Sequence, residues 1–281
     1  MIARRSFRAM GTEIELLVDA DDPDGAIAAA EAEFHRLEAL LSRFRPDSEL
    51  SSLNRAGELD AGPDLVRVTE LALRAREETD GRFDPTVHDA VVAAGYDRTF
   101  ESLAPDGPAP TARPCGGAVR IDRNRIELER GVHLDFGGIG KGFAVDRAAE
   151  ILGTAGPCLV NAGGDLAVRG GLWPVGVETG DGSLTLELTS GALATSGRDR
   201  RRWQRSGREL HHLIDPGTGA PADSDLVRAT VVATDAVTAE VWAKAVFLAG
   251  SEAGAAEADA RGLPAVLVSL DGTTRLAGGL R

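Results

Sequence analysis

The sequence predicts an α+β protein, with mixed sheets flanked by helices, that folds as a single domain over residues 1–281. Stretches with strand and helix patterns follow one another without the regular alternation of a doubly wound sheet. The length of the chain and its apolar content of 43% suffice for one large core. No internal repeat and no linker-like stretch divides the sequence.

The first elements follow from the spacing of apolar residues. Residues 12–19 alternate between apolar and polar side chains, which predicts a strand. Residues 24–44 place apolar side chains at helical spacing. Residues 63–81 predict a second helix, because Pro63 suits a first helical turn and Gly81 suits a helix end.

The middle of the chain alternates irregular and regular stretches. Residues 104–117 are rich in proline and glycine and predict a surface excursion. Residues 118–130 predict a hairpin that turns near Asn124. A short strand is expected to end at Asp135, before a glycine turn and a helix over residues 141–153.

The C-terminal half combines further strands with two helices, at residues 236–250 and 251–262. Strands are expected at residues 157–170, 173–179, 183–189, 192–197, 210–216, 226–234 and 264–270, the last of these being the final element.

Charge and composition exclude several classes of protein. The net charge of −13, from 31 basic and 44 acidic residues, argues against nucleic acid or an anionic membrane as a partner. No apolar run is long enough to span a membrane, and Glu13 and Glu15 interrupt the N-terminal stretch where a signal peptide would lie. Cys115 and Cys158 lack metal-site spacing. We therefore expect a chain that does not span the membrane and acts in the cytoplasm.

Lysine use is unusual in this chain. Among its 31 basic residues only Lys141 and Lys244 are lysines. An ammonium is a slim point charge that the planar guanidinium of arginine cannot replace in a narrow site. Either these two lysines are kept for a function, or the bias towards arginine reflects compositional drift.

The stretch at residues 133–146, "HLDFGGIGKGFAVD", is the strongest candidate for a binding turn. It fails the Walker pattern, because Asp135 and Gly142 occupy the positions of the first glycine and of the Ser/Thr. It fails the dinucleotide pattern as well, because Gly142 stands one residue before the third required glycine. Glycines, a lysine and a helix N-terminus still favour an anion. The alternative is a plain turn from strand to helix.

Eight ordered motifs resemble the ApbE family, the FAD:protein FMN transferases. The resemblance runs over nearly the whole chain and implies a T-fold-like α+β architecture. It also implies an enzyme that cleaves the pyrophosphate of FAD with Mg²⁺, transfers FMN to a Ser/Thr hydroxyl of an acceptor protein and releases AMP. The motifs are "MGTEIEL", "LSRFRPDSELSSLN", "TDGRFDPTV", "HLDFGGIGKGFAVD", "LVNAGGDLAV", "ATSGRDRRRW", "HHLIDPGTGAP" and the helix at Ala239.

The resemblance also implies the residues of the site. His212, in a His-x-x-Asp-Pro motif, is expected to be the base, because histidine titrates near neutrality. As its neighbour in a strand, His211 is expected to point to the opposite face. The other histidines, His35, His88 and His133, are expected to be structural or exposed. The expected FAD contacts are Met10, Phe44, Gly81, Arg82, Phe83, Asp135, Gly138, Lys141, Asn161, Gly163, Gly164, Asp165 and Leu213.

The sequence departs from the family at the metal site, which combines a turn carbonyl with Asp and Thr one helical turn apart. The carbonyl maps to Gly138, while Glu240 replaces the aspartate and Lys244 replaces the threonine. Glutamate can ligate Mg²⁺, but a protonated ammonium cannot.

We hypothesise that Lys244 acts in catalysis together with Lys141. Its ammonium, paired with Glu240, would either neutralise the pyrophosphate or support a shifted Mg²⁺. The alternative is a surface Glu–Lys pair worth about 0.3–0.5 kcal/mol.

Two further functions remain open at this point. In an FAD pyrophosphatase, water would replace the acceptor hydroxyl and release FMN and AMP. A non-catalytic FAD-binding protein would explain the altered metal ligands.

Overall fold

The computed structural model describes residues 1–104 and 106–280, which fold into two compact units. Each unit is assembled from segments that lie apart in the sequence. Unit 1 consists of Met1–Glu38, Ile139–Gly197 and Ser224–Arg281, and unit 2 of Ala39–Gly138 and Arg198–Asp223. The expectation that residues 1–281 act as a single domain stays a prediction.

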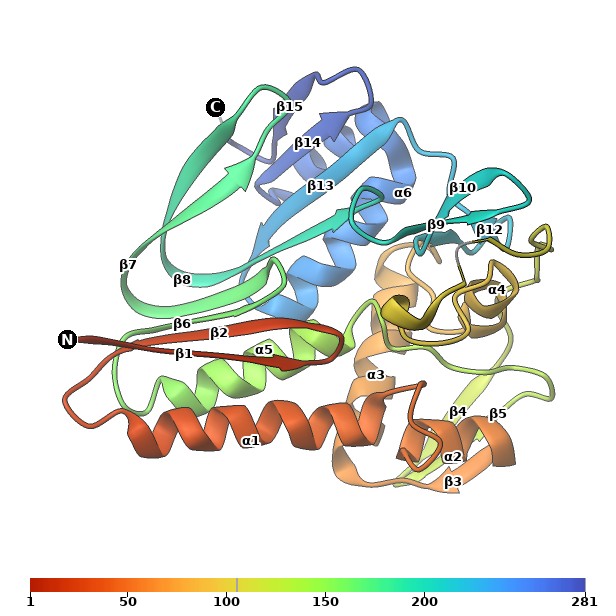
Figure 1. Cartoon of the computed structure of the whole chain (residues 1–281), viewed down its shortest axis with the longest axis horizontal. Helices are drawn as coiled ribbons and strands as arrows, with labels where there is room; N and C mark the ends of the chain where they lie inside the picture. Colours follow the sequence, from red (N-terminus) through yellow and green to blue (C-terminus); the bar gives the residue numbers. More distant parts are fainter. Residues whose placement is uncertain (105, 281) are drawn as a thin grey trace. The chain divides into compact units, whose positions relative to one another are not determined.

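Unit 1 is built on an eight-stranded antiparallel sheet, with the strand order β1-β2-β6-β7-β8-β13-β14-β15 (Figure 1). The strands are β1 (Ile2–Ala9), β2 (Thr12–Asp19), β6 (Cys158–Ala162), β7 (Asp165–Glu178), β8 (Ser183–Gly197), β13 (Leu226–Ala233), β14 (Ala265–Ser269) and β15 (Thr274–Ala277).

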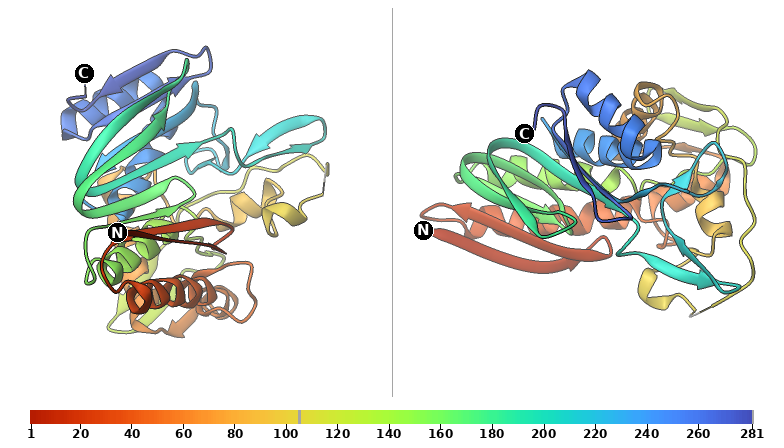
Figure 2. Two further views of the ribbon diagram at one scale, coloured as in Figure 1. Left: turned by 60° about the vertical axis from the view of Figure 1, so that its left-hand side comes forward. Right: turned by 90° about the horizontal axis from the view of Figure 1, so that it is seen from above.

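Helices α5 (Gly140–Leu152) and α6 (Ala236–Arg261) pack side by side on this sheet. Helix α5 contacts β6 and β7, while α6 runs along β8, β13 and β14 (Figure 2). Helix α1 (Asp24–Leu41) packs near β1, where the rings of Phe34 and Phe7 meet edge to face. The helices thus bury one face of the strands.

The other face of the sheet carries a second apolar core. A bulge in β7 at Gly170 and Gly171, both with positive φ, bends the strand and shifts its register against β8. Beyond this bend, Trp173, Val175 and Val177 are buried. Each such side chain contributes about 1.5–3 kcal/mol on burial, so both faces of the sheet stabilise the unit.

Unit 2 combines short helices with small sheets. Its core includes Tyr96, Trp203 and Ile214. Strands pair in the orders β3-β5-β4, β10-β9 and β11-β12. The elements are α2 (Glu49–Ala56), β3 (Glu58–Asp60), α3 (Pro63–Glu78), α4 (His88–Ala93), a 3-10 turn (Phe100–Ser102), β4 (Val119–Asp122), β5 (Arg125–Leu128), β9 (Arg202–Arg205), β10 (Arg208–His211), β11 (Ile214–Asp215) and β12 (Ala220–Pro221).

The α+β prediction is confirmed, and several elements lie where they were expected. Strand β2, helices α3 and α5 and the hairpin β4–β5 match their predicted ranges closely. The two expected C-terminal helices form α6, which is interrupted at Gly250 (φ 83°). The expected strands at residues 183–189 and 192–197 form one strand, β8.

Other expectations were wrong. The predicted strand before Asp135 does not form, because the side chain of Asn54 holds both backbone groups of Leu134 and replaces a strand partner. The stretch 210–216 breaks after His211. Strand β1, helices α2 and α4, and strand β15 were not expected.

The predicted excursion at 104–117 has no regular element among described residues 106–117, and Pro105 lies outside the described residues. Cys115 and Cys158 are free thiols, and burial raises the pKa of each to about 11. None of the helices in the described part of the chain is both long and apolar enough to cross a membrane.

Candidate active site

Three predicted site residues meet in unit 1, where α5 and α6 pack together. The ammonium of Lys141 lies 2.6 Å from Asp165 Oδ2 and also contacts Glu240 Oε1. Glu240 Oε2 accepts a hydrogen bond of 2.8 Å from the backbone N–H of Gly142. Asp165 and Glu240 are each 3% exposed. Both carboxylates are therefore buried and hydrogen-bonded, as buried charges must be.

The electrostatics of this cluster follow from its burial. Burial disfavours the charged form of Lys141, but Asp165 and Glu240 outweigh burial and raise the pKa of the ammonium. Burial, helped by Asp165, raises the pKa of Glu240, and the two lysines oppose it. Because both oxygens of Glu240 accept hydrogen bonds, the geometry fits the ionised carboxylate.

Helices α5 and α6 cap each other's N-termini. Glu240 of α6 accepts from Gly142 in the first turn of α5. In return, Asp146 of α5 accepts from the N–H groups of Ala236 (2.8 Å) and Val237 (3.0 Å) in the first turn of α6. Each carboxylate satisfies N–H groups that have no partner within their own helix. Burial raises the pKa of Asp146 to about 6 despite these bonds.

The glycine at position 142 permits this packing. A Cβ atom there would lie 2.6 Å from the carbonyl oxygen of Ala236 and 2.9 Å from the amide nitrogen of Val237. Only glycine allows the backbones of α5 and α6 to approach so closely. The helix N-terminus of the glycine turn does hold an anion, as its pattern favours, but this anion is the chain's own Glu240.

Two tight hairpin turns of unit 1 carry further predicted FAD contacts. Gly163 and Gly164 form the two-residue loop between β6 and β7, with φ of 65° and 106°. Asn161 Oδ1 accepts a hydrogen bond from the Gly164 N–H. In the β1–β2 turn, Met10 has an unusual φ of 53°, and its N–H donates to Glu38 Oε1 over 2.8 Å. These turns have a structural reason of their own, and the FAD contacts stay predictions.

In unit 2, Asp135 is bound to an arginine that the sequence did not single out. Asp135 Oδ2 lies 2.8 Å from Arg43 Nε, and Oδ1 accepts a 2.6 Å bond from the Gly137 N–H. The guanidinium of Arg43 stacks over the rings of Phe44 (4.1 Å) and Tyr96 (4.8 Å). This stack fixes Phe44, a predicted FAD contact, beside the entry to the glycine turn.

The predicted turn over residues 81–83 closes the end of α3. Gly81 has φ 78°, and its N–H donates to the carbonyl of Arg76 over 2.8 Å. The N–H of Phe83 donates to Thr79 Oγ1 over 3.0 Å. Phe83 is 3% exposed, whereas Gly81 and Arg82 are half-buried.

The two adjacent histidines have different environments. His211 is 3% exposed, its Nε2 lies 3.0 Å from the carbonyl of Ala222, and its Nδ1 accepts from the N–H of Leu213 over 3.3 Å. Burial lowers the pKa of His211 to about 4, so it is neutral at physiological pH. His212 is half-buried and follows strand β10, so the two histidines do not share a strand, and their opposite orientation stays a prediction. Leu213 is 1% exposed.

Comparison with known proteins assigns this chain to a family. The model of the ApbE family matches residues 10–267, which run through both units. The chain belongs to the ApbE family.

Its relatives carry one recurrent name. A Klebsiella pneumoniae protein named FAD:protein FMN transferase is 34% identical over 238 residues, which is 79% of this chain and 74% of that protein. One from Haemophilus influenzae with the same name is 28% identical over 279 residues, or 87% and 81% of the two chains. The crystal structure of the ApbE protein from Thermotoga maritima is 26% identical, has a TM-score of 0.89 and covers 99% of this chain and 97% of its own.

The side chains at the expected magnesium position differ from the Asp and Thr ligands that the resemblance to the ApbE family implies. Lys244 is half-buried on α6, and its charge opposes the effect of burial, which raises the pKa of Glu240. Because Glu240 is buried, this lysine does not belong to an ordinary surface pair. Both oxygens of Glu240 already accept from Lys141 and Gly142, and position 244 supplies an ammonium where a hydroxyl oxygen would be needed. These side chains do not fit the oxygen ligands that the resemblance implies for Mg²⁺. Gly138, the predicted carbonyl ligand, is a buried residue of unit 2.

The sequence did not indicate several residues of this ApbE chain that the structure brings together. Arg43 and Asp146 were not singled out. His88, Asp89 and His133 were not linked, although they meet in unit 2. An acidic residue inside an apolar helical stretch, as in "FAVDRAA" and "TAEVWAK", is a signal that would have drawn attention to Asp146 and would have suggested a partner for Glu240 on another element.

Proposed function

We propose that this chain transfers the FMN part of FAD to a serine or threonine hydroxyl of an acceptor protein and releases AMP. The observation that carries the proposal is the ApbE match over residues 10–267, together with relatives named FAD:protein FMN transferase. Residues predicted to contact FAD occur in both units, and each group is held by buried contacts of its own unit. A cytoplasmic place of action stays a prediction from the sequence.

His212 is the proposed base of the reaction. The acceptor oxygen attacks the FMN phosphorus, the bond from this phosphorus to the bridging oxygen breaks, and AMP leaves with the electron pair. The hydroxyl proton passes to His212. His211 is unsuited to this role, because both of its nitrogens are engaged and its pKa lies near 4. A base must hold a proton near the working pH.

The proposal is tested with the purified full chain, FAD, Mg²⁺ and an acceptor domain, followed by mass spectrometry of the acceptor. We expect the acceptor to gain FMN, and His212→Ala to slow transfer by about 10²–10⁴-fold. The matched control is His35→Ala, which removes an exposed histidine of α1. Free FMN and AMP without acceptor modification would indicate a pyrophosphatase. Unmodified acceptor with intact FAD would leave a binding protein.

We further propose that Lys244 takes the place of the family's metal ion. Asp165, Glu240 and Lys141 together carry one negative charge, and Lys244 brings this group to neutrality. A threonine at position 244 would leave that negative charge, which an added cation would have to balance. A neutral cluster does not repel the negatively charged pyrophosphate of FAD. A negatively charged cluster would, and this repulsion is stronger in a buried site than in water.

The variant Lys244→Thr tests this replacement. We expect the wild-type chain to keep transferring FMN in EDTA, and the variant to require added Mg²⁺. Calorimetry of the FAD-free proteins should show Mg²⁺ binding to the variant and not to the wild type. Transfer by the wild type that is lost in EDTA and unchanged by Lys244→Ala would disprove the replacement.

A further inference from the structure

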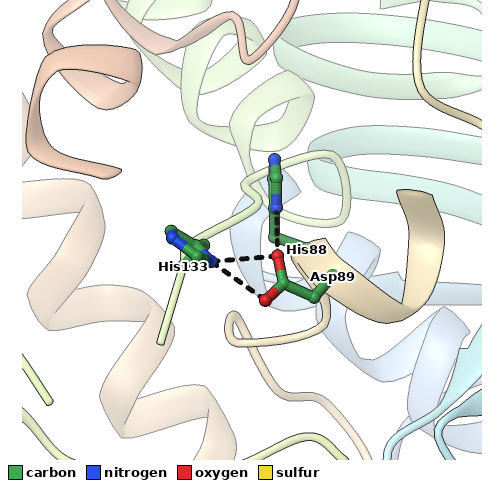
Figure 3. Close-up of side chains that lie close together, drawn as sticks. All are labelled: His88, Asp89 and His133. Atoms are coloured by element: carbon green, nitrogen blue, oxygen red, sulfur yellow. Dashed lines mark hydrogen bonds and ion pairs between the residues drawn. The ribbon is translucent and has the colours of Figure 1, made fainter. Parts of the chain in front are cut away.

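Three side chains of unit 2 that the proposed transferase reaction does not use come together at one point (Figure 3). His88 Nδ1 lies 2.9 Å from Asp89 Oδ1, and His133 Nδ1 lies 2.9 Å from both carboxylate oxygens of Asp89. His88 and Asp89 are the first two residues of α4. His133 comes from the irregular segment that leads into the glycine turn.

The backbone around these side chains is held firmly. Next to His133, Leu134 donates to Asn54 Oδ1 over 2.8 Å and accepts from Asn54 Nδ2 over 2.9 Å. The N–H of Asp135 donates to the carbonyl of Pro85 over 2.8 Å, which ties this segment to the loop before α4. The three side chains are therefore positioned before any ligand arrives, and this reduces the ordering cost of binding.

The donor atoms have the chemistry of a transition-metal site. Two imidazole nitrogens and one carboxylate oxygen suit Zn²⁺, Cu²⁺ or Ni²⁺, whereas Mg²⁺ prefers oxygen ligands alone. A tetrahedral zinc site with bonds of about 2.0–2.1 Å places its ligand atoms roughly 3.3 Å apart. The observed separations of 2.9 Å between nitrogen and oxygen atoms are close to this requirement.

The cluster is accessible to an ion from solvent. The side chains of His88, Asp89 and His133 are 22%, 43% and 35% exposed. The carboxylate of Asp89 lies at the centre of the cluster, where both imidazoles contact it, and its negative charge attracts a cation. Metal binding through Nδ1 would require each imidazole to carry its proton on Nε2.

We propose that His88, Asp89 and His133 bind one divalent transition-metal ion, with water completing the coordination. The bound ion joins α4 to the segment that enters the glycine turn and stabilises unit 2. This site goes beyond the proposed transfer of FMN, and its donors differ from the oxygen ligands that Mg²⁺ requires.

Calorimetric titration of the full chain with Zn²⁺, without FAD, tests the site. We expect one site in the wild type, no competition by excess Mg²⁺, and affinity at least ~10-fold weaker in His88→Gln, Asp89→Asn and His133→Gln. The control His35→Gln removes an exposed histidine of α1 and should bind Zn²⁺ as the wild type does. Equal affinity in the wild type and the three site variants would overturn the proposal.

A second measurement separates loss of the site from loss of the fold. Circular dichroism should show native spectra for all variants without metal, because the three side chains are partly exposed. Co²⁺ added to the wild type should give the strong visible absorption of a four-coordinate site with nitrogen ligands. The His88→Gln/His133→Gln double variant should give the weak spectrum of the hydrated ion. Strong absorption that persists in a folded double variant would refute the assignment.

Discussion

Two regions of the molecule use charged side chains in opposite ways. One is the group of charges where α5 and α6 pack together, and the other is the histidine cluster of unit 2. In the first region, Asp165 and Glu240 are almost fully buried and are matched by Lys141. In the second, Asp89 is 43% exposed, and two partly exposed imidazoles surround it. A buried carboxylate must carry its counter-ion with it, whereas a partly exposed one can draw a cation from solution. The first region is therefore a closed part of the fold and the second is an open one.

The largest expected effect comes from opening the closed region. The variant Glu240→Ala removes one partner of Lys141 and the cap on Gly142, and should lower the free energy of unfolding by about 3–5 kcal/mol. Chemical denaturation measures this change. Glu257→Ala is the matched control, because Glu257 pairs with Arg261 on the exposed side of the same helix and should cost less than about 1 kcal/mol. Equal losses in the two variants would contradict the contrast.

A smaller effect is expected from crowding the same junction. In Gly142→Ala, the new methyl group meets the backbone of Ala236 and Val237, which should cost about 1–3 kcal/mol. The control is Gly25→Ala in α1, where a Cβ would have no neighbour within 4 Å. That change should be neutral or stabilise the protein by up to about 1 kcal/mol. Thermal and chemical denaturation of both variants provide the comparison, and an unaffected Gly142→Ala protein would show that the helices can move apart.

The buried side chain of His211 should make the stability of the protein depend on pH. Its folded-state pKa of about 4 lies below the ordinary value of 6.5, so its contribution to stability is complete above pH 6.5 and is lost as pH falls towards 4. When the pH falls from 7 to 5, the free energy of unfolding of the wild type should decrease by about 2 kcal/mol more than that of His211→Gln.

Asp146 titrates over much of the same pH range and in the opposite direction, because its raised pKa of about 6 favours stability at low pH. It is present in both proteins, so its effect cancels in the difference between them. Identical pH profiles for the wild type and His211→Gln would mean that His211 is protonated without cost in the folded state.

The smallest effect is expected in the open region. Without added metal, His133→Gln should change the free energy of unfolding by less than about 1 kcal/mol, because its interaction with Asp89 is partly exposed to solvent. Denaturation in the presence of a chelator measures it. If His133→Gln lowered the free energy of unfolding as much as Glu240→Ala, the histidine cluster would stabilise the fold as strongly as the buried charges do.

Local patterns predicted much of the fold. Strand β2 and helix α3 were predicted from period and end signals alone, because their apolar faces are regular and continuous. Strand β1 was missed because it is an edge strand with an uneven burial pattern, and its Arg4 and Arg5 pair with glutamates in place of core contacts. The segment before Asp135 has an apolar strand pattern but takes its hydrogen bonds from the Asn54 side chain, which no periodicity reveals.

The sequence named candidate site residues one by one, but it did not indicate which of them contact one another. Lys141 was singled out as unusual because it is one of only two lysines, yet its partner Glu240 lies 99 positions away. Pairings of this kind depend on how α5 and α6 pack, and packing is not encoded in the spacing of a single motif. The same limit hid the cluster of His88 and His133, because only the fold brings α4 next to the segment before the glycine turn.

Glu240 caps the first turn of α5 and Asp146 caps the first turn of α6, and this reciprocal capping affects how unit 1 opens. Neither helix can fray at its first turn without breaking the hydrogen bonds that its backbone N–H groups donate to the carboxylate of the other helix. The amide protons of both first turns should consequently exchange with solvent in a single concerted event, although the two turns lie more than 90 residues apart along the chain.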